Sequence, residues 1–333
     1  MTDPQQRIAF IMGLGRSGTT FLAKLIDSSP DVLYRHEPDA ILPVDMPALL
    51  HRSDLQPHLP KARDYLRAMS HCRRRRSASH VPVFTKGYRS ALANLAFRPM
   101  VLSTKLAETW RLPLTASVPD LIDRGRGEVV YLIKSVSSLG RARLFADAQP
   151  DMPMVHIVRH PCAMIASLKV GIGKGVMAPD VYLRSLFAQK EAASYPYSFE
   201  AMEKASYEEQ AAFRWMLMND KAAADMAGHP RYLQIAYEDL CRQVDRVAAQ
   251  VFDHIGIKIG AQTRAFIDSV SRREDPAAMG AEARRTGYFK IDRPIASALD
   301  KWRTALEPET VARIRDVVSH SPLGRHYFEA ASA

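Results

Sequence analysis

Cysteine, long hydrophobic runs and clustered metal ligands are all scarce in this sequence. Three cysteines occur in 333 residues, and no pair of them has metal-ligand spacing: Cys72, Cys162 and Cys241. The sequence therefore indicates neither a disulfide framework nor a zinc site, and we expect no bound metal. The longest apolar run near the start, Ile8 to Leu14, is too short to cross a bilayer and lacks the features of a signal peptide. We therefore expect a cytoplasmic protein.

Extremes of composition are missing as well. Hydrophobic residues make up 47% of the chain and charged residues 25%, which is typical of soluble globular proteins and excludes collagen-like and disordered chains. The sequence has no internal repeat, no low-complexity segment and no clear linker. We therefore expect a single domain over residues 1–333.

Acidic residues are nearly absent from residues 61–105. This segment holds eleven lysines and arginines, four of them consecutive from Arg73 to Arg76, and one acid, Asp64. The whole chain has 46 basic and 36 acidic residues, a formal net charge of +10, so the remainder has no net formal charge. Any attraction of anionic partners therefore originates mainly in this segment.

Short apolar runs alternate with helical patterns along most of the chain. Four runs are apolar at nearly every position, as in parallel strands covered on both faces: Arg7–Met12, Val129–Ile133, Met154–Val158 and Tyr232–Ala236. Asp31–Tyr34 is a weaker strand candidate. Helical patterns occupy Thr19–Ser28, Pro161–Leu168, Tyr207–Ala227, Leu240–Ile255 and Glu307–Ser319. This alternation predicts a three-layer α/β fold, with a central parallel sheet flanked by helices.

Residues 40–125 interrupt this alternation. They contain several prolines and only short helical patterns. We expect them to form a helical insertion over the carboxyl edge of the sheet, within the same domain.

A glycine-rich loop follows the first predicted strand and leads into a predicted helix. Its sequence is Gly13-Leu14-Gly15-Arg16-Ser17-Gly18-Thr19-Thr20. Several backbone N–H groups and a helix N-terminus then surround one point, and the helix dipole is positive there. Such a loop favours the binding of a phosphate group.

Two phosphate-binding patterns fit this loop. Three glycines match the dinucleotide pattern G-x-G-x-x-G: Gly13, Gly15 and Gly18. Glu37 and Asp39 follow about 20 residues later, where a ribose-binding acid would lie. The loop also matches a nucleotide phosphate loop in which Thr19 occupies the usual lysine position and Arg16 supplies a cation instead. A missing lysine disfavours nucleotide triphosphate hydrolysis, whereas an NAD(P)-dependent reductase stays an alternative.

A second candidate phosphate site follows the predicted strand Met154–Val158. Arg159 leaves this strand, and Ser167 lies eight residues later, two turns into the next predicted helix. A guanidinium offers a fork of hydrogen-bond donors, and the serine hydroxyl adds one more. The pair would hold a second phosphate group.

Both loops resemble motifs of the sulfotransferases that use 3′-phosphoadenosine 5′-phosphosulfate (PAPS). The segment GLGRSGTTFLAKLIDSSPDVLYRHEP is similar to their 5′-phosphosulfate loop, and VRHPCAMIAS is similar to their 3′-phosphate motif. The runs YLQIAYEDL and Lys301-Trp302-Arg303 also resemble family landmarks. The resemblance covers most of residues 7–325, thinly over 40–125, and is nearest to the carbohydrate (Golgi-type) branch.

This resemblance implies a P-loop-like fold, PAPS as sulfuryl donor, adenosine 3′,5′-bisphosphate as product and no metal requirement. By position, the first loop would hold the 5′-phosphosulfate through Gly15, Arg16, Ser17, Gly18, Thr19 and Thr20. Arg159 and Ser167 would hold the 3′-phosphate, which distinguishes this donor from ATP. Arg285-Thr286-Gly287 is similar to a loop that closes on the same phosphate, although Thr286 replaces the family's lysine.

The resemblance also implies a catalytic set. Glu37 matches the general base of carbohydrate sulfotransferases, and His36 is the alternative base. Pro38 favours an extended backbone at Glu37. Lys134 resembles a lysine near the reacting centre, and together with Arg16 it would offset charge on the leaving oxygen.

The acceptor is predicted by class only. The resemblance implies a hydroxyl group on a carbohydrate or glycolipid, bound by the insertion at residues 40–125. Arg73 to Arg76 would receive an anionic acceptor, contact an anionic membrane surface, or form a solvated face. No nucleic-acid motif accompanies them, so we expect no nucleic-acid partner. The alternatives to a sulfotransferase are the reductase and a non-catalytic polyanion-binding protein.

Overall fold

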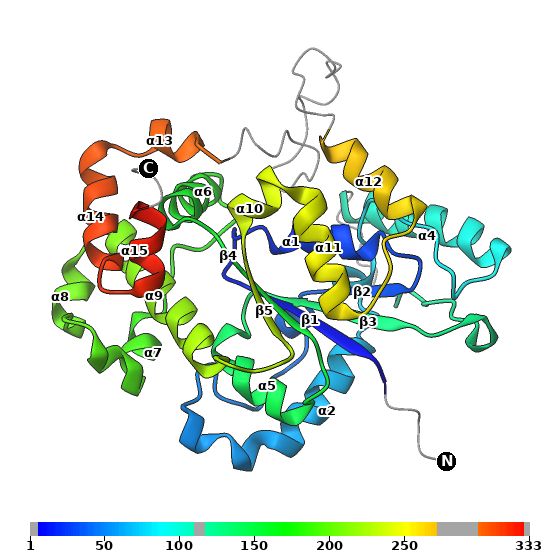
Figure 1. Cartoon of the computed structure of the whole chain (residues 1–333), viewed down its shortest axis with the longest axis horizontal. Helices are drawn as coiled ribbons and strands as arrows, with labels where there is room; N and C mark the ends of the chain where they lie inside the picture. The colour runs from blue at the N-terminus through cyan, green and yellow to red at the C-terminus, as the bar shows by residue number, and fades with distance from the viewer. Residues whose placement is uncertain (1–5, 110–116, 272–298, 330–333) are drawn as a thin grey trace.

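A five-stranded parallel sheet lies at the centre of the computed structural model, which describes residues 6–109, 117–271 and 299–329 (Figure 1). The strands pair in the order β2-β3-β1-β4-β5. Their bounds are β1 (Ile8–Met12), β2 (Val32–His36), β3 (Val130–Ser135), β4 (Met154–Val158) and β5 (Tyr232–Ala236). The predicted α/β fold with a central parallel sheet is confirmed, and the weaker strand candidate forms the edge strand β2.

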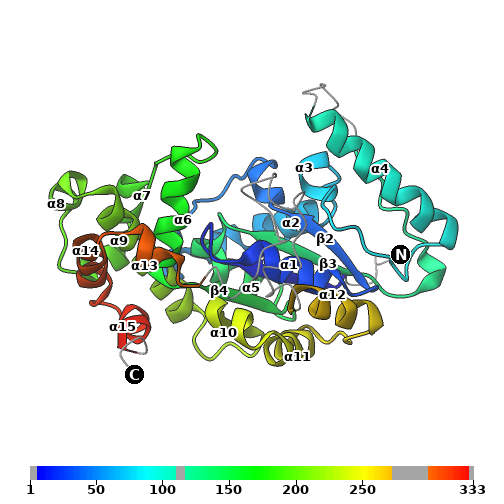
Figure 2. The same ribbon diagram turned by 90° about the horizontal axis from the view of Figure 1, so that it is seen from above.

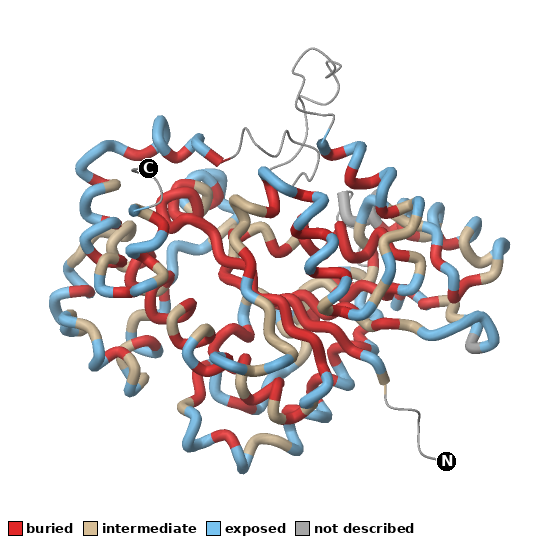
Figure 3. Tube along the Cα trace, viewed as in Figure 1, coloured by how far each residue is buried: buried red, intermediate tan, exposed pale blue. Residues whose placement is uncertain are grey.

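Helices cover both faces of the sheet (Figures 1 and 2). Because successive residues of a strand point to opposite faces, Phe10 and Met12 pack into one core, and Ala9 and Ile11 into the other. The first core includes residues of α2 (Leu59–Ser70), α5 (Ala142–Ala148), α6 (Pro161–Gly173) and α9 (Tyr207–Asp225). The second includes residues of α1 (Thr19–Asp27), α10 (Tyr237–Arg242), α11 (Val244–Ile255) and α12 (Ala261–Ser271). Strands β1 to β4 between these two layers are almost continuously buried (Figure 3). In β5, only Ile235 is buried.

Two further groups of helices lie at opposite ends of the molecule (Figure 2). Around α9 and α6 pack α7 (Leu183–Phe187), α8 (Phe199–Lys204), α13 (Lys301–Ala305), α14 (Pro308–Val318) and α15 (Pro322–Glu329). Beyond the edge strand β2 lie α3 (Arg75–Ala78) and α4 (Ala91–Thr109). Short 3-10 helices are η1 (Pro38–Ala40), η2 (Arg52–Asp54), η3 (Gln56–His58), η4 (Arg124–Arg126), η5 (Leu139–Arg141) and η6 (Lys190–Ser194).

The helix predicted over residues 240–255 is two helices in the structure. Between α10 and α11, Gln243 leaves the helical conformation, with φ −136° and ψ 53°. This bend lets Leu240 of α10 and Val247 of α11 pack into the same core.

Residues 40–125 contain helices, but one of them, α2, lies on a face of the sheet and not above its carboxyl edge. Leu66 and Met69 of α2 are fully buried in the core formed with Phe10 and Phe145. An apolar stripe of this kind is stabilised by burial against the sheet, which an edge cannot offer.

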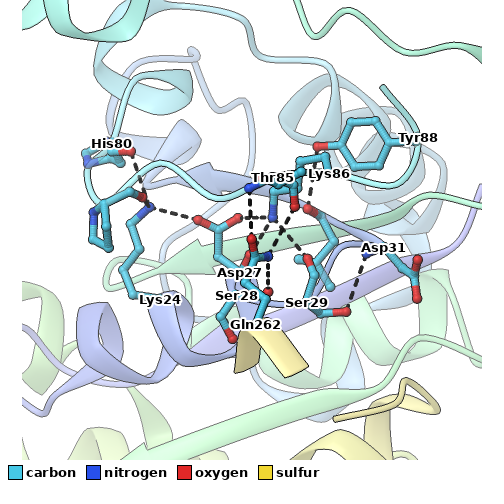
Figure 4. A network of polar contacts seen from close by, with 12 residues as sticks. Lys24, Asp27, Ser28, Ser29, Asp31, His80, Thr85, Lys86, Tyr88 and Gln262 are labelled. Carbon is cyan, nitrogen blue, oxygen red and sulfur yellow. Dashed lines mark hydrogen bonds and ion pairs between the residues drawn. The ribbon is translucent and has the colours of Figure 1, made fainter. Parts of the chain in front are cut away.

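Several cations of the basic segment are internal. Lys86 donates to the Asp27 carboxylate at 2.8 Å and to the backbone oxygen of Ser29 at 3.1 Å, and Lys24 donates to the other Asp27 oxygen at 2.8 Å (Figure 4). Burial lowers the pKa of Lys86 to about 8. These contacts fasten the loop before α4 to the end of α1. Part of the positive charge of residues 61–105 is therefore buried inside the fold.

A second internal cluster surrounds Asp120. Arg35 of β2 is 2% exposed and donates to both Asp120 carboxylate oxygens, at 2.8 and 2.7 Å. Arg73 reaches the same carboxylate at 3.0 Å, and Arg89 donates to the Asp120 backbone oxygen at 2.8 Å. Because an unpaired buried charge is costly, this cluster ties Arg73, Arg89 and Asp120 to the edge strand.

Over the described residues, no helix is long and apolar enough to span a membrane. The same part of the chain contains no group of three or more His, Cys, Asp or Glu side chains arranged to hold a metal ion.

Candidate functional site at the carboxyl edge of the sheet

The β1–α1 loop follows a path that requires small residues. A Cβ atom on Gly13 would lie 2.5 Å from the backbone oxygen of Ile157 in β4, so this loop passes directly against the neighbouring strand. Gly18 has φ +90°, and a Cβ atom there would overlap the ring of Tyr237. The left-handed conformation and the lack of space both select glycine at position 18.

This loop presents the start of α1 toward the carboxyl edge. Gly18 precedes the helix, and α1 has no side-chain cap. The first N–H groups of any α-helix have no acceptor within the helix, and the dipole is positive at that end. Ser17 and Thr19 are only 1% and 3% exposed, which fixes the loop against the core. The arrangement suits an anionic group at residues 15–20.

The structure brings the two predicted phosphate sites together. Arg16 Nε donates to the Ser167 hydroxyl at 2.9 Å, although 151 positions separate the two residues in the sequence. Arg159 Nη1 donates to the Arg16 backbone oxygen at 3.0 Å. The glycine loop after β1 and the start of α6 after β4 therefore form adjoining walls of one site.

Two aromatic residues position Arg159. Its guanidinium carbon lies 4.6 Å from the centre of the Tyr237 ring, and its backbone oxygen accepts a hydrogen bond from Trp215 Nε1 at 2.9 Å. The sequence pattern indicates Trp215 and Tyr237 only as core or capping residues. In the structure, Tyr237 contacts both walls of the site, because its ring also lies against Gly18.

His160 and Glu238 hold the start of α6 in place. Glu238 accepts a hydrogen bond from the His160 backbone N–H at 3.0 Å, and burial raises the pKa of this carboxyl group. The His160 ring is stacked on Trp302, with ring centres 4.6 Å apart. Burial and the nearby arginines lower the pKa of His160 to about 4, so the ring is neutral near pH 7. It contributes packing here and no positive charge.

A buried ion pair lies at the ends of β2 and β3, in the same edge. Lys134 of β3 is 2% exposed, and its ammonium group contacts Glu37 Oε1. Glu37 also donates its backbone N–H to the Lys134 backbone oxygen at 2.8 Å. Burial lowers the pKa of Lys134, while the Glu37 charge opposes this shift. The predicted base and the predicted catalytic lysine are therefore in direct contact.

The backbone of Glu37 is left-handed, with φ 43° and ψ 51°, so the extended conformation expected before Pro38 is wrong. The chain finishes its pairing with β3 at Glu37 and turns at once into η1, which leaves no room for an extended residue. Such a conformation is unfavourable for a residue with a side chain and persists where surrounding contacts compensate. The two contacts with Lys134 supply that compensation.

Polar neighbours fix the residues on both sides of Glu37. His36 Nδ1 lies 2.6 Å from Tyr34 Oη, and His36 Nε2 lies 3.8 Å from Glu37 Oε1. The ring of His80, from the insertion, lies against the His36 ring at a centre-to-centre distance of 4.0 Å. The contacts of Tyr34 and His80 were not predicted from the sequence.

Asp39 is held just beyond Glu37. The hydroxyl groups of Ser135 and Ser138 donate to Asp39 Oδ2, the latter at 2.8 Å. Together with Glu37 and Arg16, this carboxylate contributes to the electrostatic surroundings of Lys134. Charged groups from three neighbouring strand ends therefore converge on one region.

Comparison with known proteins decides the family of this chain. The sulfotransferase family matches residues 9–260, about three quarters of the sequence. The chain belongs to the sulfotransferase family. Human and mouse carbohydrate sulfotransferase 2 are each 20% identical to it over 94% of its length. The chain spans 63% of the length of these curated relatives.

Solved sulfotransferase structures are distant from this member of the family. A sulfotransferase domain from the curacin biosynthetic pathway is 14% identical, with a TM-score of 0.43, and the match covers 95% of this chain and 99% of that domain. A mouse sulfotransferase complexed with PAP is also 14% identical, with a TM-score of 0.43, and the match covers 98% of this chain and 89% of that chain.

The strand order of this member of the sulfotransferase family disfavours the dinucleotide alternative. In a dinucleotide-binding fold, the ribose-binding acid follows the strand that lies next to β1. Here β3 lies between β1 and β2, so Glu37 and Asp39 follow a strand that is not adjacent to the glycine loop. Of the two strands that pair with β1, β3 ends at Lys134 and Ser135 and β4 is followed by Arg159. Two predicted donor-binding residues, Arg285 and Gly287, lie outside the described residues.

Proposed function

We propose that this chain transfers a sulfuryl group from PAPS to a hydroxyl group of a carbohydrate or glycolipid. The observation that carries the proposal is the hydrogen bond between Arg16 and Ser167. Arg159 also donates a hydrogen bond to the backbone of Arg16, in the β1–α1 loop. A nucleotide with phosphate groups at both its 5′ and 3′ positions needs two anion sites at one edge of the sheet. A ligand with a single phosphate does not need the second.

Donor binding follows from the chemistry of the two walls. The backbone of residues 15–20 and the hydroxyl groups of Ser17, Thr19 and Thr20 would hold the 5′-phosphosulfate. The guanidinium of Arg159 and the hydroxyl of Ser167 would hold the 3′-phosphate through charge-assisted hydrogen bonds. Arg16 contacts Ser167 and follows Gly15 in the loop, so it lies between the two phosphate sites.

Glu37 is the proposed general base. Its carboxylate would take the proton of the acceptor hydroxyl as the new S–O bond forms and the bond to the 5′-phosphate breaks. Lys134 and Arg16 would offset the charge that develops on the leaving oxygen. A cation about 4 Å away contributes on the order of 4 kcal/mol at an effective dielectric constant near 20. The Glu37–Lys134 ion pair supports this assignment, because it orients the carboxylate at the carboxyl edge of the sheet.

The carbohydrate acceptor is supported by the similarity to carbohydrate sulfotransferase 2, which extends over 94% of this chain. The insertion at residues 40–125 is the proposed acceptor-binding part. It contributes His80, which lies against His36, immediately before the proposed base. An acceptor bound there would present its hydroxyl group to Glu37.

The proposal is tested by an acceptor screen with PAPS carrying a labelled sulfuryl group and extracted cell-envelope glycans and lipids. We expect label on a carbohydrate-containing product, and a rate of labelling about 10²–10⁴-fold lower when Glu37→Gln replaces the wild-type chain. Label on phenols or simple alcohols only would contradict the carbohydrate acceptor. No transfer to any acceptor, together with no binding of adenosine 3′,5′-bisphosphate, would contradict the activity itself.

A further inference from the structure

Helix α4 carries an exposed stripe of leucines. Leu92 is 78% exposed, Leu95 74% and Leu102 50%. At about 100° per residue, these positions and Pro99 fall on one side of the helix. Single exposed leucines are ordinary on protein surfaces, whereas an aligned set on one helix indicates a contact surface.

The opposite side of α4 already packs against the protein. Phe97 and Val101 are buried in a small apolar cluster with Val118, and Ala78 of α3 packs on that cluster. Rotation of α4 to bury its leucines would therefore expose this second apolar side. The leucines are therefore not the core-facing side of α4, because Phe97 and Val101 already form that side.

The charged side chains that residues 65–104 contribute around the stripe are all basic. Arg98 lies beside Leu95 and Leu102 on the helix surface. Arg74, which immediately precedes the neighbouring α3, and Arg76 of α3 are also exposed. Residues 65–104 contain no aspartate or glutamate. Unlike Lys86 and Arg89, these three arginines lie on the outside of the fold.

We propose that α3 and α4 form a peripheral docking surface for an anionic lipid membrane. The leucines would enter the acyl boundary, while Arg74, Arg76 and Arg98 meet the phosphate groups of the lipids. The location of α4 at one end of the molecule leaves it free to approach a flat surface (Figure 2). This inference stands on the surface alone and does not rest on the proposed activity.

Charge complementarity favours a membrane over a second copy of the chain. A two-fold contact through α4 would bring the same arginines from both copies to one interface, where no acid of residues 65–104 could neutralise them. An anionic membrane supplies the opposite charge and an apolar layer at the same time. The leucines would then contact the apolar layer, and the arginines the anionic headgroups.

The test is sedimentation of the full chain with vesicles of phosphatidylcholine, with and without phosphatidylglycerol. We expect binding to the anionic vesicles and weakening of that binding by added salt. In Arg74→Gln/Arg76→Gln, the loss of two charges worth about 1 kcal/mol each lowers binding about 30-fold. In Leu92→Ser/Leu95→Ser, loss of the apolar contact lowers binding by more than about tenfold.

Control variants remove exposed apolar side chains or an exposed charge elsewhere on the surface. Val170→Ser/Val176→Ser removes two exposed apolar side chains near the end of α6, and Arg184→Gln removes an exposed charge on α7. We expect both controls to bind like the wild type, and all variants to keep its thermal unfolding midpoint.

Three results would overturn the proposal. The first is that the wild type does not bind the vesicles. The second is that the control variants lose as much vesicle binding as the α4 variants do. The third is a wild-type dimer in analytical ultracentrifugation that Leu92→Ser/Leu95→Ser converts to a monomer, because the occupant of the stripe would then be a second copy.

Discussion

Glu37 is the residue on which the proposed chemistry depends. It combines a left-handed backbone with an ion pair to a buried lysine, and the two features are linked. The backbone turn aims the side chain at Lys134, while the ion pair offsets the cost of the turn. A carboxylate held in this way is oriented before any acceptor arrives, which favours its use as a base.

Glu37→Gln removes the proton acceptor and keeps the shape of the side chain. We expect kcat to fall by about 10²–10⁴-fold, the usual contribution of a general base. The affinity for adenosine 3′,5′-bisphosphate should stay close to that of the wild type, because Glu37 is not part of the proposed phosphate sites. Steady-state kinetics and calorimetry measure the two quantities.

His36 provides the comparison for that variant. The structure holds its ring between Tyr34 and Glu37, which suits an orienting role. His36→Ala should therefore reduce kcat less than Glu37→Gln does. An inactive His36→Ala beside an active Glu37→Gln would move the base to His36.

At the scale of residues, the sequence could indicate which side chains carry charge or donate hydrogen bonds, but not which of them meet. Arg16 and Ser167 are separate motifs in the sequence, and only the adjacency of β1 and β4 joins them. The contact of Tyr34 with His36 could not be predicted, because an apolar residue in a strand is ordinarily a core position. Buried cations such as Arg35 and Lys86 also escape prediction, since their partners lie far along the chain.

At the scale of elements, the strands could be predicted because β1 is apolar at every position, β4 is apolar at every position but His156, and both are covered on both faces. The edge strand β2 gave a weaker signal, since it contains Arg35 and His36 among its five residues. The order of the strands could not be predicted, because it depends on which helix covers which face. The placement of α2 on the sheet was missed for the same reason.

The β1–α1 loop allows a sharp comparison between two glycines. A Cβ atom on Gly13 would lie 2.5 Å from a backbone oxygen of β4, whereas a Cβ atom on Gly15 meets nothing within 4 Å. We expect Gly13→Ala to lower the urea midpoint of unfolding, because β4 or the loop must shift. Gly15→Ala should unfold like the wild type.

Nucleotide binding should rank the same two variants differently. Gly15 belongs to the proposed phosphate loop, so Gly15→Ala should weaken the binding of adenosine 3′,5′-bisphosphate without a loss of stability. Wild-type affinity in Gly15→Ala would show that no phosphate approaches the backbone at this position.

At the scale of the whole molecule, His156 joins the sheet to the helical layer. Its side chain is fully buried in β4, with Nδ1 2.8 Å from Tyr232 Oη in β5 and Nε2 3.0 Å from Asn219 Oδ1 in α9. Burial lowers the pKa of His156 from 6.5 to about 4. Below pH 6.5, the unfolded chain binds a proton that the folded protein excludes, so stability falls as the pH falls toward 4.

The size of this effect follows from the shift in pKa. At about 1.4 kcal/mol per unit, His156 accounts for roughly 3 kcal/mol of the free energy of unfolding lost by pH 4. His156→Gln should be less stable than the wild type at pH 7 but show a shallower decline on acidification. Urea unfolding between pH 7 and pH 4 measures both slopes, and parallel slopes would contradict this account.

The central claim is that one nucleotide bridges the glycine loop and the Arg159–Ser167 pair. Calorimetric titration of the wild type and of Arg159→Gln/Ser167→Ala, with adenosine 3′,5′-bisphosphate and with adenosine 5′-monophosphate, tests it most directly. Because hydrogen bonds to a charged group contribute about 1.5–3 kcal/mol, the 3′-phosphate should tighten binding to the wild type by at least about tenfold. That preference should disappear in the double variant. Equal binding of the two nucleotides to the wild type, or an unchanged preference in the variant, would contradict the claim.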